Sequence, residues 1–303
     1  MTSSTEEVAK TVPAEYLLGD RGLYLSALRG LSARSGGRRL ENRLMARVRL
    51  RFYGALNEFL APDRREREFE YRSARAASVK NAIEAVGVPH TEVEWVLVDG
   101  EPVDFSYPVR EGDRICVYPD AKAVEAGAAV RLRPAPSTRL SFVADSHLGG
   151  LARLLRMLGF DTLYSNDYHD REVRRIAHEQ DRVVLTRDRD LLMCRDVTHG
   201  CFVHALRPAE QIGEVVSRLR LLGAAQPFTR CLYCNTPLSP VEKAAVVHRI
   251  PPNAAKFYDR FASCPSCERI YWEGSHWKRM SGLLETLLSS SGPGSGAERS
   301  GHG

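Results

Sequence analysis

Two C-x-x-C pairs, Cys231 with Cys234 and Cys264 with Cys267, restrict what this chain can fold into more than any other feature. A C-x-x-C turn points two thiolates at one ion, and two such turns complete a tetrahedral Zn²⁺ site with no open coordination position. We therefore predict a structural zinc ribbon over residues 227–282. A redox pair or disulfides are the alternatives, although no thioredoxin-like pattern surrounds either pair.

The other cysteines and the spacing of the pairs add two expectations. The 29 residues between the pairs exceed the ~15 to 20 that are usual in ribbons, so the insert "HRIPPNAAKFYDRF" is expected to need packing of its own. The three remaining cysteines lie on strand or helix patterns and are expected to be buried apolar residues; they are Cys116, Cys194 and Cys201.

Length and composition set broad limits. With 303 residues the chain has room for two or three domains, and its contents of 43% hydrophobic and 27% charged residues are ordinary for a globular protein. No stretch approaches the roughly 18 apolar residues of a membrane span, and the N-terminus lacks the basic-then-apolar order of a secretory signal. We predict a cytoplasmic protein. The net charge of +5 only weakly favours an anionic partner.

Residues 46–120 predict a small β-grasp domain of the ubiquitin-like type. The pattern consists of the strand "ARVRLRFYG" (46–54), the strand "REFEYR" (67–72), the helix "VKNAIEAVG" (79–87) after the N-cap Ser78, the strand and Asp-Gly turn "VEWVLVDGEPV" (93–103), and the last strand "GDRICVYP" (112–119). The segment resembles the sulfur-carrier proteins of molybdopterin and thiamine biosynthesis. Those carriers end in a free Gly-Gly, whereas this strand ends at Tyr118-Pro119 and the chain continues. We therefore expect a docking module for a protein partner.

Strand and helix patterns alternate over residues 138–226. The strands are "RLSFVAD" (139–145), "DTLYS" (161–165), "RVVLT" (182–186) and "CFVHAL" (201–206), and the helices are "HLGGLARLLRMLG" (147–159), "REVRRIAHEQ" (171–180), "RDLLMC" (189–194) and "AEQIGEVVSRLRLL" (209–222). In the first helix one apolar face is formed by Leu148, Leu151, Leu155 and Leu158. Four β-α units predict a parallel sheet covered on both faces. Together with the β-grasp domain and the ribbon, this sheet predicts a multidomain chain of the α+β and α/β classes.

Acidic residues follow the strands of this predicted sheet. Asp145 ends the first strand, and Asp188 and Asp190 follow the third; the start of the second helix adds Asp167, Asp170 and Glu172. Sites in parallel sheets form at the carboxyl ends of strands, and oxygen ligands suit Mg²⁺ or Mn²⁺. However, Asp145 and Asp188 can equally be N-caps of the helices that follow them. The spacing alone leaves both interpretations open.

Several motifs together resemble one known family. They are "FVADSHLGGLARLLRMLGFDTLYSND", "VVLTRDRDLL", "RCLYCNTPL" and "CPSCERIYWEGSHWKRM", and the resemblance runs from Arg47 to Met280. They resemble the Mut-seven C-terminal RNase domain family of PIN-like nucleases, which is often preceded by a ubiquitin-like β-grasp. The resemblance implies a PIN-like sheet in which acidic residues hold divalent metal and cut RNA.

When the acidic residues of the family are matched to this sequence by position, the resemblance implies a role for particular acids. Asp145 and Asp188 match the acids that end the first and third strands, where Mg²⁺ or Mn²⁺ would bind. Asp170 is our choice for the middle acid, with Glu172 and Asp167 behind it, and Asp190 is a candidate fourth ligand. PIN domains commonly bring another acid from a later strand, but "CFVHALRP" contains none.

Basic residues near these segments are candidates for contacts with single-stranded RNA. They are Arg153, Arg156, Arg187 and Arg189 beside the strand ends, and Lys278 among the aromatic residues that follow the last cysteine. A solvated helix face is the alternative for the arginines, and a small ribbon core is the alternative for the aromatic residues. We predict a metal-dependent ribonuclease with a structural zinc ribbon. The competing hypothesis is a non-catalytic RNA-binding adaptor that uses the ribbon and the β-grasp domain.

The remaining segments are polar or of low complexity. Residues 1–45 and 283–303 are expected to be disordered tails, and residues 121–137 a linker. Met45 directly precedes the first patterned strand, so Met1 and Met45 are both candidate start residues.

Overall fold

The computed structural model describes residues 45–75, 77–119, 132, 140–274, 278 and 282. The chain divides into two compact units between Leu132 and Arg133. The expected tails and linker lie outside the described residues, except for Met45, which begins a strand, and Leu132. Within the described ranges, no helix has the length and apolar character that a membrane crossing requires.

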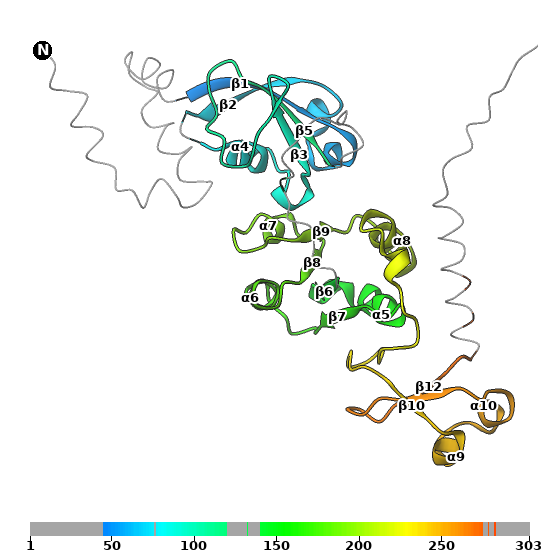
Figure 1. Ribbon diagram of the computed structural model, residues 1–303. Coiled ribbons are helices and arrows are strands. Elements are labelled where there is room, and N and C mark those ends of the chain that lie inside the picture. Colours follow the sequence, from blue (N-terminus) through cyan, green and yellow to red (C-terminus); the bar gives the residue numbers. More distant parts are fainter. Residues whose placement is uncertain are drawn as a thin grey trace, which may run out of the picture. The chain divides into compact units, whose positions relative to one another are not determined.

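In the described residues, the first unit is a five-stranded mixed sheet with one α-helix (Figure 1). Its strands are β1 (Met45–Phe52), β2 (Phe69–Ala74), β3 (Trp95–Val98), β4 (Glu101–Pro102) and β5 (Arg114–Tyr118), in the order β2-β1-β5-β3-β4. Helix α4 spans Val79–Ala85, and the 3₁₀ turns are η2 (Gly54–Phe59), η3 (Pro62–Arg64) and η4 (His90–Glu92). Only the central pair β1–β5 is parallel.

Local sequence explains this unit well. Alternate residues of β1 are fully buried, from Ala46 to Phe52, while the arginines between them face outward. The Ser78 hydroxyl accepts the Asn81 N–H at 3.3 Å, which confirms the predicted N-cap. Asp99 and Gly100 both have positive φ angles, 51° and 92°, as expected for a tight hairpin turn between β3 and β4.

The second unit begins with a four-stranded parallel sheet. Its strands are β6 (Ser141–Ala144), β7 (Asp161–Tyr164), β8 (Val183–Thr186) and β9 (Gly200–Phe202), in the order β7-β6-β8-β9. The helices are α5 (Gly149–Met157), α6 (Asp170–Gln180), α7 (Arg189–Leu192) and α8 (Pro208–Arg218), with the 3₁₀ turns η6 (Ser146–Leu148) and η7 (Leu221–Ala224). The predicted order of strands and helices is confirmed, with shorter strands than the sequence pattern indicated.

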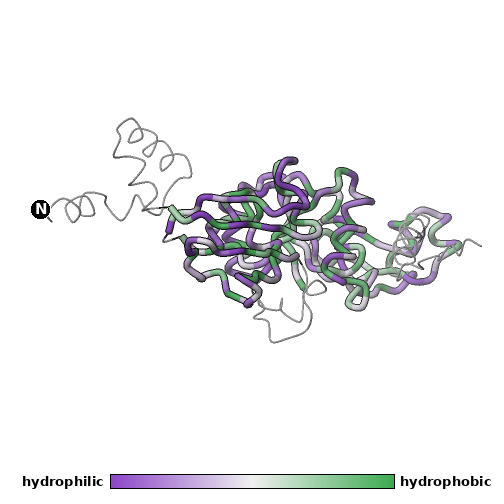
Figure 2. Tube along the Cα trace, turned by 90° about the horizontal axis from the view of Figure 1, so that it is seen from above, coloured by the Kyte–Doolittle hydropathy of each residue, from purple (hydrophilic) through white to green (hydrophobic). Residues whose placement is uncertain are grey.

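Helices cover both faces of this sheet, as Figure 1 shows for α6 and α7 on one side and α5 and α8 on the other. Phe142 and Leu185 pack with α5 and α8, whereas Val143 and Val184 pack with α6 and α7. All four leucines of the predicted apolar face of α5 are at most 3% exposed. The strands are buried on both sides, which is why they read as continuous apolar runs. Hydrophobic and hydrophilic stretches can be followed along the chain in Figure 2.

The cysteine-containing part follows in the same unit. Its strands are β10 (Ser239–Val241), β11 (Phe261–Ser263) and β12 (Ile270–Trp272), which form an antiparallel sheet. The segment between β10 and β11, which includes most of the insert, forms α9 (Lys243–Val246), η8 (Val247–Arg249) and α10 (Pro252–Phe257). This segment and β11 share a small core of four buried residues, Val246, Ile250, Ala254 and Phe261. The long spacing between the cysteine pairs is therefore filled by a segment that packs on itself, as expected.

The close contact between the turn after α5 and the backbone of Gln226 can be tested by mutation. Gly159 has a φ angle of +90°, and an added Cβ would lie 2.0 Å from the backbone oxygen of Gln226. We expect Gly159→Ala to lower the free energy of unfolding by more than about 1 kcal/mol, because it adds both backbone strain and a clash with fixed backbone. Gly223→Ala is the matched control, since nothing lies within 4 Å of its added Cβ. Urea unfolding of both variants measures the difference in the free energy of unfolding. Equal midpoints would contradict the close packing of Gly159 against the Gln226 backbone.

Candidate active site and metal centre

Thr186 links the two acids that end neighbouring strands. Its hydroxyl donates to Oδ2 of Asp145 at 2.8 Å and accepts the backbone N–H of Asp188 at 2.9 Å. Thr186 is fully buried at the end of β8, and the Asp145 N–H donates to the Leu185 carbonyl at 3.0 Å. Thr186, which the sequence interpretation had not placed in the site, thus links the Asp145 carboxylate to the Asp188 backbone.

Asp145 is held as a charged carboxylate. Its Oδ1 accepts the Ser146 hydroxyl, the His147 N–H and the His147 imidazole Nδ1, each at 3.1 Å. Burial alone would raise the pKa of Asp145, but the hydrogen bonds from His147, Thr186 and Ser146 outweigh it and the pKa is lowered. Asp145 is therefore ionised at neutral pH even though its side chain is only 13% exposed.

Both strand-end aspartates also cap the helical turns that follow them. Asp145 is the N-cap of η6, and Asp188 is the N-cap of α7, where its Oδ1 accepts the Asp190 N–H at 2.8 Å. Asp188 and Asp190 are exposed, and the Cys194 thiol donates to the Asp190 carbonyl. The capping alternative that the sequence left open is thus present at both positions. It leaves Asp188 at the surface, accessible to a ligand.

The candidate middle acids lie at the start of α6. Asp170 is exposed, and its charge acts on the half-buried Cys194. Burial is the main cause that raises the pKa of this thiol; the charges of Asp196, Asp170 and Asp188 add to it, and Arg174 opposes it. The charges of Asp170 and Asp188 thus both act on this thiol, although the two residues come from different elements.

The two reserve candidates are less suited to hold a metal. Glu172 forms an ion pair with Arg175 at 2.7 Å, and this neighbour is the main cause that lowers the pKa of Glu172. Asp167 is exposed in the turn before α6, and its N–H donates to the Ser165 hydroxyl at 3.2 Å.

The acids do not form a compact group of three. Within the described part of the chain, the four paired cysteines are the only set of three or more acidic, thiol or imidazole groups whose ligand atoms all lie within 4.8 Å. Capping holds Asp145 and Asp188 in place, and like charges oppose closer approach. Two carboxylates are nevertheless a suitable donor set for Mg²⁺, which keeps several waters and commonly uses one or two carboxylates plus substrate phosphates.

A carboxylate does reach the end of the fourth strand, but it comes from a helix. Glu214 of α8 accepts the N–H groups of His204, at 3.0 Å, and Ala205, at 2.9 Å, just after β9. It satisfies backbone donors there and also pairs with Arg218 at 3.5 Å. A sequence search for an acid on the strand itself could not find it.

Three of the arginines expected near the strand ends are exposed. They are Arg153 on α5, Arg187 after β8 and Arg189 on α7. The Arg187 guanidinium donates to the Ala205 carbonyl at 3.3 Å. Lys278, the other basic candidate, is also exposed, and its N–H donates to the Gly274 carbonyl at 3.0 Å.

Arg156 differs from the expectation that it contacts RNA. It is only 4% exposed, and its Nε donates to the Thr162 carbonyl at 2.9 Å. Its NH1 donates to the carbonyls of Leu232, at 3.2 Å, and Tyr233, at 2.7 Å, inside the first cysteine pair. Arg156 thus bonds α5 and β7 to the ribbon, and it is removed from the set of candidate RNA contacts. Its position among leucines gave no sign of this role.

Asn235 and Asp161 complete this connection. The Asn235 Oδ1 accepts the Thr162 N–H at 3.0 Å, and its Nδ2 donates to Asp161 at 2.7 Å. Arg182 also donates to Asp161, at 2.7 Å. Burial would raise the pKa of Asp161, but these two donors outweigh it and the pKa is lowered. The first cysteine pair is therefore fixed at the amino end of β7, whereas the strand-end acids lie at the carboxyl ends.

The four cysteine sulfurs form a compact group. The Sγ atoms of Cys231 and Cys267 lie 3.5 Å apart, and those of Cys234 and Cys264 lie 3.4 Å apart. Tetrahedral Zn²⁺ with Zn–S bonds of about 2.3 Å places its sulfurs roughly 3.8 Å apart, close to this spacing. The donor set and the spacing therefore fit zinc, as the sequence predicted.

The two cysteine turns have the same backbone design. In each, the second cysteine's N–H points to the first cysteine's sulfur at 3.4 Å. Asn235 and Glu268 follow the turns with φ angles of 68° and 57°, so each turn closes through a left-handed residue. This repetition is what aims two thiols of each turn at a common point.

Hydrogen bonds around the sulfurs favour metal binding. The Tyr271 hydroxyl lies 3.0 Å from the Cys231 sulfur. Burial would raise the pKa of the Cys234 thiol, but hydrogen bonds from Thr236 and the neighbouring thiols lower it to about 6. Cys234 is thus a thiolate, the form that binds metal, at neutral pH.

The aromatic residues of β12 divide between two environments. Tyr271 faces the cysteines, while Ile270 and Trp272 pack against the small ribbon core, which agrees with the core alternative. Of the three cysteines outside the C-x-x-C turns, Cys201 is buried as expected, whereas Cys116 and Cys194 are only partly buried.

Family models match two parts of the chain. Residues 45–125 match the Mut7-C ubiquitin model, and residues 140–284 match the Mut7-C RNAse domain model. No curated protein and no solved structure matches the chain. The second match spans both the parallel sheet and the cysteine-containing part described above. The chain therefore carries a Mut7-C RNAse domain in residues 140–284, with a Mut7-C ubiquitin domain in front of it in residues 45–125.

Proposed function

We propose that this protein is a metal-dependent ribonuclease that hydrolyses RNA phosphodiester bonds at the carboxyl ends of β6 and β8. The observation that carries the proposal is the bridge from Asp145 through the Thr186 hydroxyl to the backbone of Asp188. A helix cap alone does not require a buried threonine between two strand ends. The match to an RNAse domain family supports RNA as the substrate class.

The chain's own residues would then have distinct tasks. Asp145 and Asp188 hold Mg²⁺ or Mn²⁺, with Asp170 and Asp190 as further ligands and with Asp167 and Glu172 in reserve. When bound, such an ion activates water and stabilises charge on the phosphate. Thr186 fixes the orientation of the Asp145 carboxylate. The exposed guanidiniums of Arg153, Arg187 and Arg189 contact phosphates of a single strand, with Lys278 as a further contact.

The cysteine site is proposed to hold one structural Zn²⁺ through Cys231, Cys234, Cys264 and Cys267. We expect about one zinc per chain, close to complete loss of zinc in Cys234→Ser, and full retention in Cys194→Ser, which changes a cysteine outside the C-x-x-C turns. The apparent unfolding midpoint should fall only in the first variant, because zinc binds the folded chain. Elemental analysis and thermal unfolding measure both; equal zinc content in the two variants would contradict the assignment.

Cleavage of labelled single-stranded RNA tests the acidic site. Metal ions supply several kcal/mol of transition-state stabilisation, so Asp145→Asn/Asp188→Asn should lower the Mn²⁺- or Mg²⁺-dependent rate by at least about a hundredfold. Asp63→Asn/Asp259→Asn removes two exposed carboxylates elsewhere and should cut normally. Cleavage that survives the first pair of changes would contradict the proposed site.

The Thr186 bridge can be tested separately. Thr186→Val keeps the buried shape but loses both hydrogen bonds, and groups that orient metal ligands typically contribute 10- to 100-fold in affinity or activity. We expect a rise of roughly tenfold or more in the Mn²⁺ concentration needed for half-maximal cleavage. Thr162 is also a fully buried threonine and lies in the amino-terminal part of β7, so Thr162→Val is the control and should leave the Mn²⁺ requirement unchanged. Cleavage by the two variants is measured at increasing Mn²⁺ concentration, and an equal Mn²⁺ requirement in both would contradict the role of the Thr186 bridge.

The adaptor hypothesis remains the second candidate, because both strand-end aspartates do cap helical turns. An adaptor would bind RNA equally well after Asp145→Asn/Asp188→Asn and would show no cleavage in either form. Fluorescence anisotropy beside the cleavage assay separates the two hypotheses.

Two further expectations concern the setting of the protein. A protein partner of the β-grasp domain stays a prediction. A cytoplasmic location likewise stays a prediction from the sequence.

A further inference from the structure

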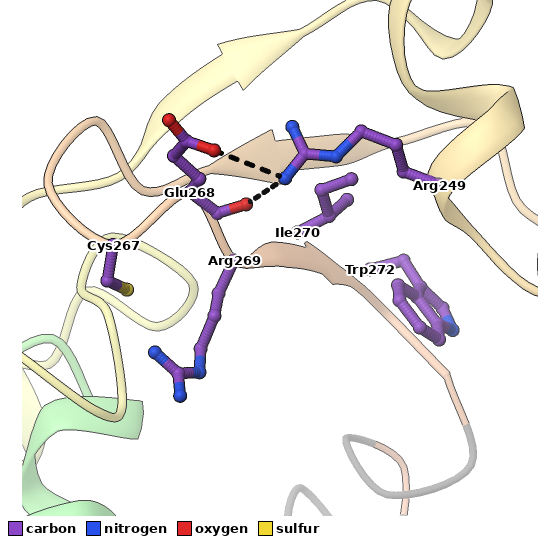
Figure 3. Close-up of a pocket in the computed structure, with 6 residues that line it drawn as sticks. All are labelled: Arg249, Cys267, Glu268, Arg269, Ile270 and Trp272. Atoms are coloured by element: carbon purple, nitrogen blue, oxygen red, sulfur yellow. Dashed lines mark hydrogen bonds and ion pairs between the residues drawn. The ribbon is translucent and has the colours of Figure 1, made fainter.

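A shallow hollow on the ribbon is separate from the strand-end acids. It has a volume of about 420 Å³ and is lined by Arg249, Cys267, Glu268, Arg269, Ile270 and Trp272. Figure 3 shows the guanidiniums of Arg249 and Arg269 and the indole of Trp272 around it. Neither the acidic site nor the structural role of zinc accounts for this combination of groups.

One side of the hollow carries a guanidinium stacked on an exposed ring. The Arg269 guanidinium carbon lies 3.7 Å from the centroid of Tyr233, and Tyr233 is 61% exposed. Tyr233 belongs to the first cysteine turn and Arg269 follows the second, so the four cysteines hold the pair together.

The other side offers a second cation and an aromatic wall. Arg249 donates to the Glu268 carbonyl at 2.7 Å and pairs with its carboxylate at 3.9 Å. Both side chains are exposed, so the ion pair is weak and an incoming phosphate can compete for the guanidinium. Trp272 lies beside them and packs on Phe261, with ring centroids 6.5 Å apart.

We propose that this hollow binds a nucleotide of single-stranded RNA. Arg249 and Arg269 bind the phosphate, Trp272 offers a ring face on which a base stacks, and the exposed ring of Tyr233, just outside the hollow beside Arg269, offers a second one. A paired base keeps its faces inside a duplex, so the hollow selects unpaired RNA. The inference rests on the proposed function, because RNA is taken as the substrate. The Tyr233 carbonyl is bonded to Arg156, so the subsite is attached to the RNAse fold.

RNA binding by the full zinc-loaded chain tests the inference, in the Asp145→Asn/Asp188→Asn background so that no RNA is cut. The probe is a labelled 12-nucleotide oligouridine, followed by fluorescence anisotropy. Tyr233→Ala/Arg249→Gln should weaken binding by about tenfold or more, because it removes one stacking face and one phosphate contact. The slope of log affinity against log salt should also fall by about 0.7, as expected for one lost phosphate contact on a single strand.

A closely matched control exists on the same ribbon. Phe257 is 67% exposed, and the Lys256 ammonium lies 5.5 Å from its ring centroid, outside the hollow. Lys256→Gln/Phe257→Ala therefore removes the same kinds of group and should change affinity by less than about twofold. Equal losses in both variants, or no loss in either, overturn the inference.

Two checks keep the outcome decisive. If Tyr233→Ala/Arg249→Gln loses zinc, Arg249→Gln alone, which leaves the cysteine turns unchanged, should still weaken binding and lower the salt slope; unchanged binding overturns the inference. Cleavage by the unsubstituted chain is measured separately. A chain that binds through the hollow but never cuts RNA contradicts the proposed ribonuclease and not the subsite. A chain that cuts RNA while its hollow variant binds like the control contradicts the subsite alone.

Discussion

The parallel pairing of β6 with β8 is the constraint on which the candidate site depends. Ala144 pairs with Leu185, so the next residue of each strand, Asp145 and Thr186, meet where the strands end. Alternate residues of both strands pack against the helices on the two faces of the sheet, so the pairing is held by burial on both sides. The packing that stabilises the sheet thus also places the Asp145 carboxylate beside the Thr186 hydroxyl, which accepts the Asp188 N–H.

A second connection ties the ribbon to this sheet. Arg156 reaches from α5 to carbonyls of the first cysteine turn, and Asn235 reaches back to β7 and Asp161. A buried arginine whose donors are used in this way is costly to leave unpaired. Hydrogen bonds thus connect the first cysteine turn to α5 and β7, and one family model spans both parts.

Much of the fold could be predicted from the sequence because it depends on local patterns. The alternation of strands and helices, the Ser78 cap and the cysteine pairs each follow from a few neighbouring residues. Arg156 and Asn235 were not readable, because their partners lie more than 70 residues away in the chain. The Thr186 bridge was hidden for a similar reason, since its acceptor is 41 residues distant. Glu214 was missed because its carboxylate reaches a strand end from a helix.

The central claim is that Asp145 and Asp188 hold a divalent metal ion, and Mn²⁺ binding measures it most directly because no RNA substrate need be known. The zinc-loaded chain and its Asp145→Asn/Asp188→Asn variant are titrated with Mn²⁺ and followed by electron paramagnetic resonance. We expect a saturable Mn²⁺ site in the unsubstituted chain that the variant lacks. Identical titrations would contradict the claim and leave both aspartates as helix caps alone.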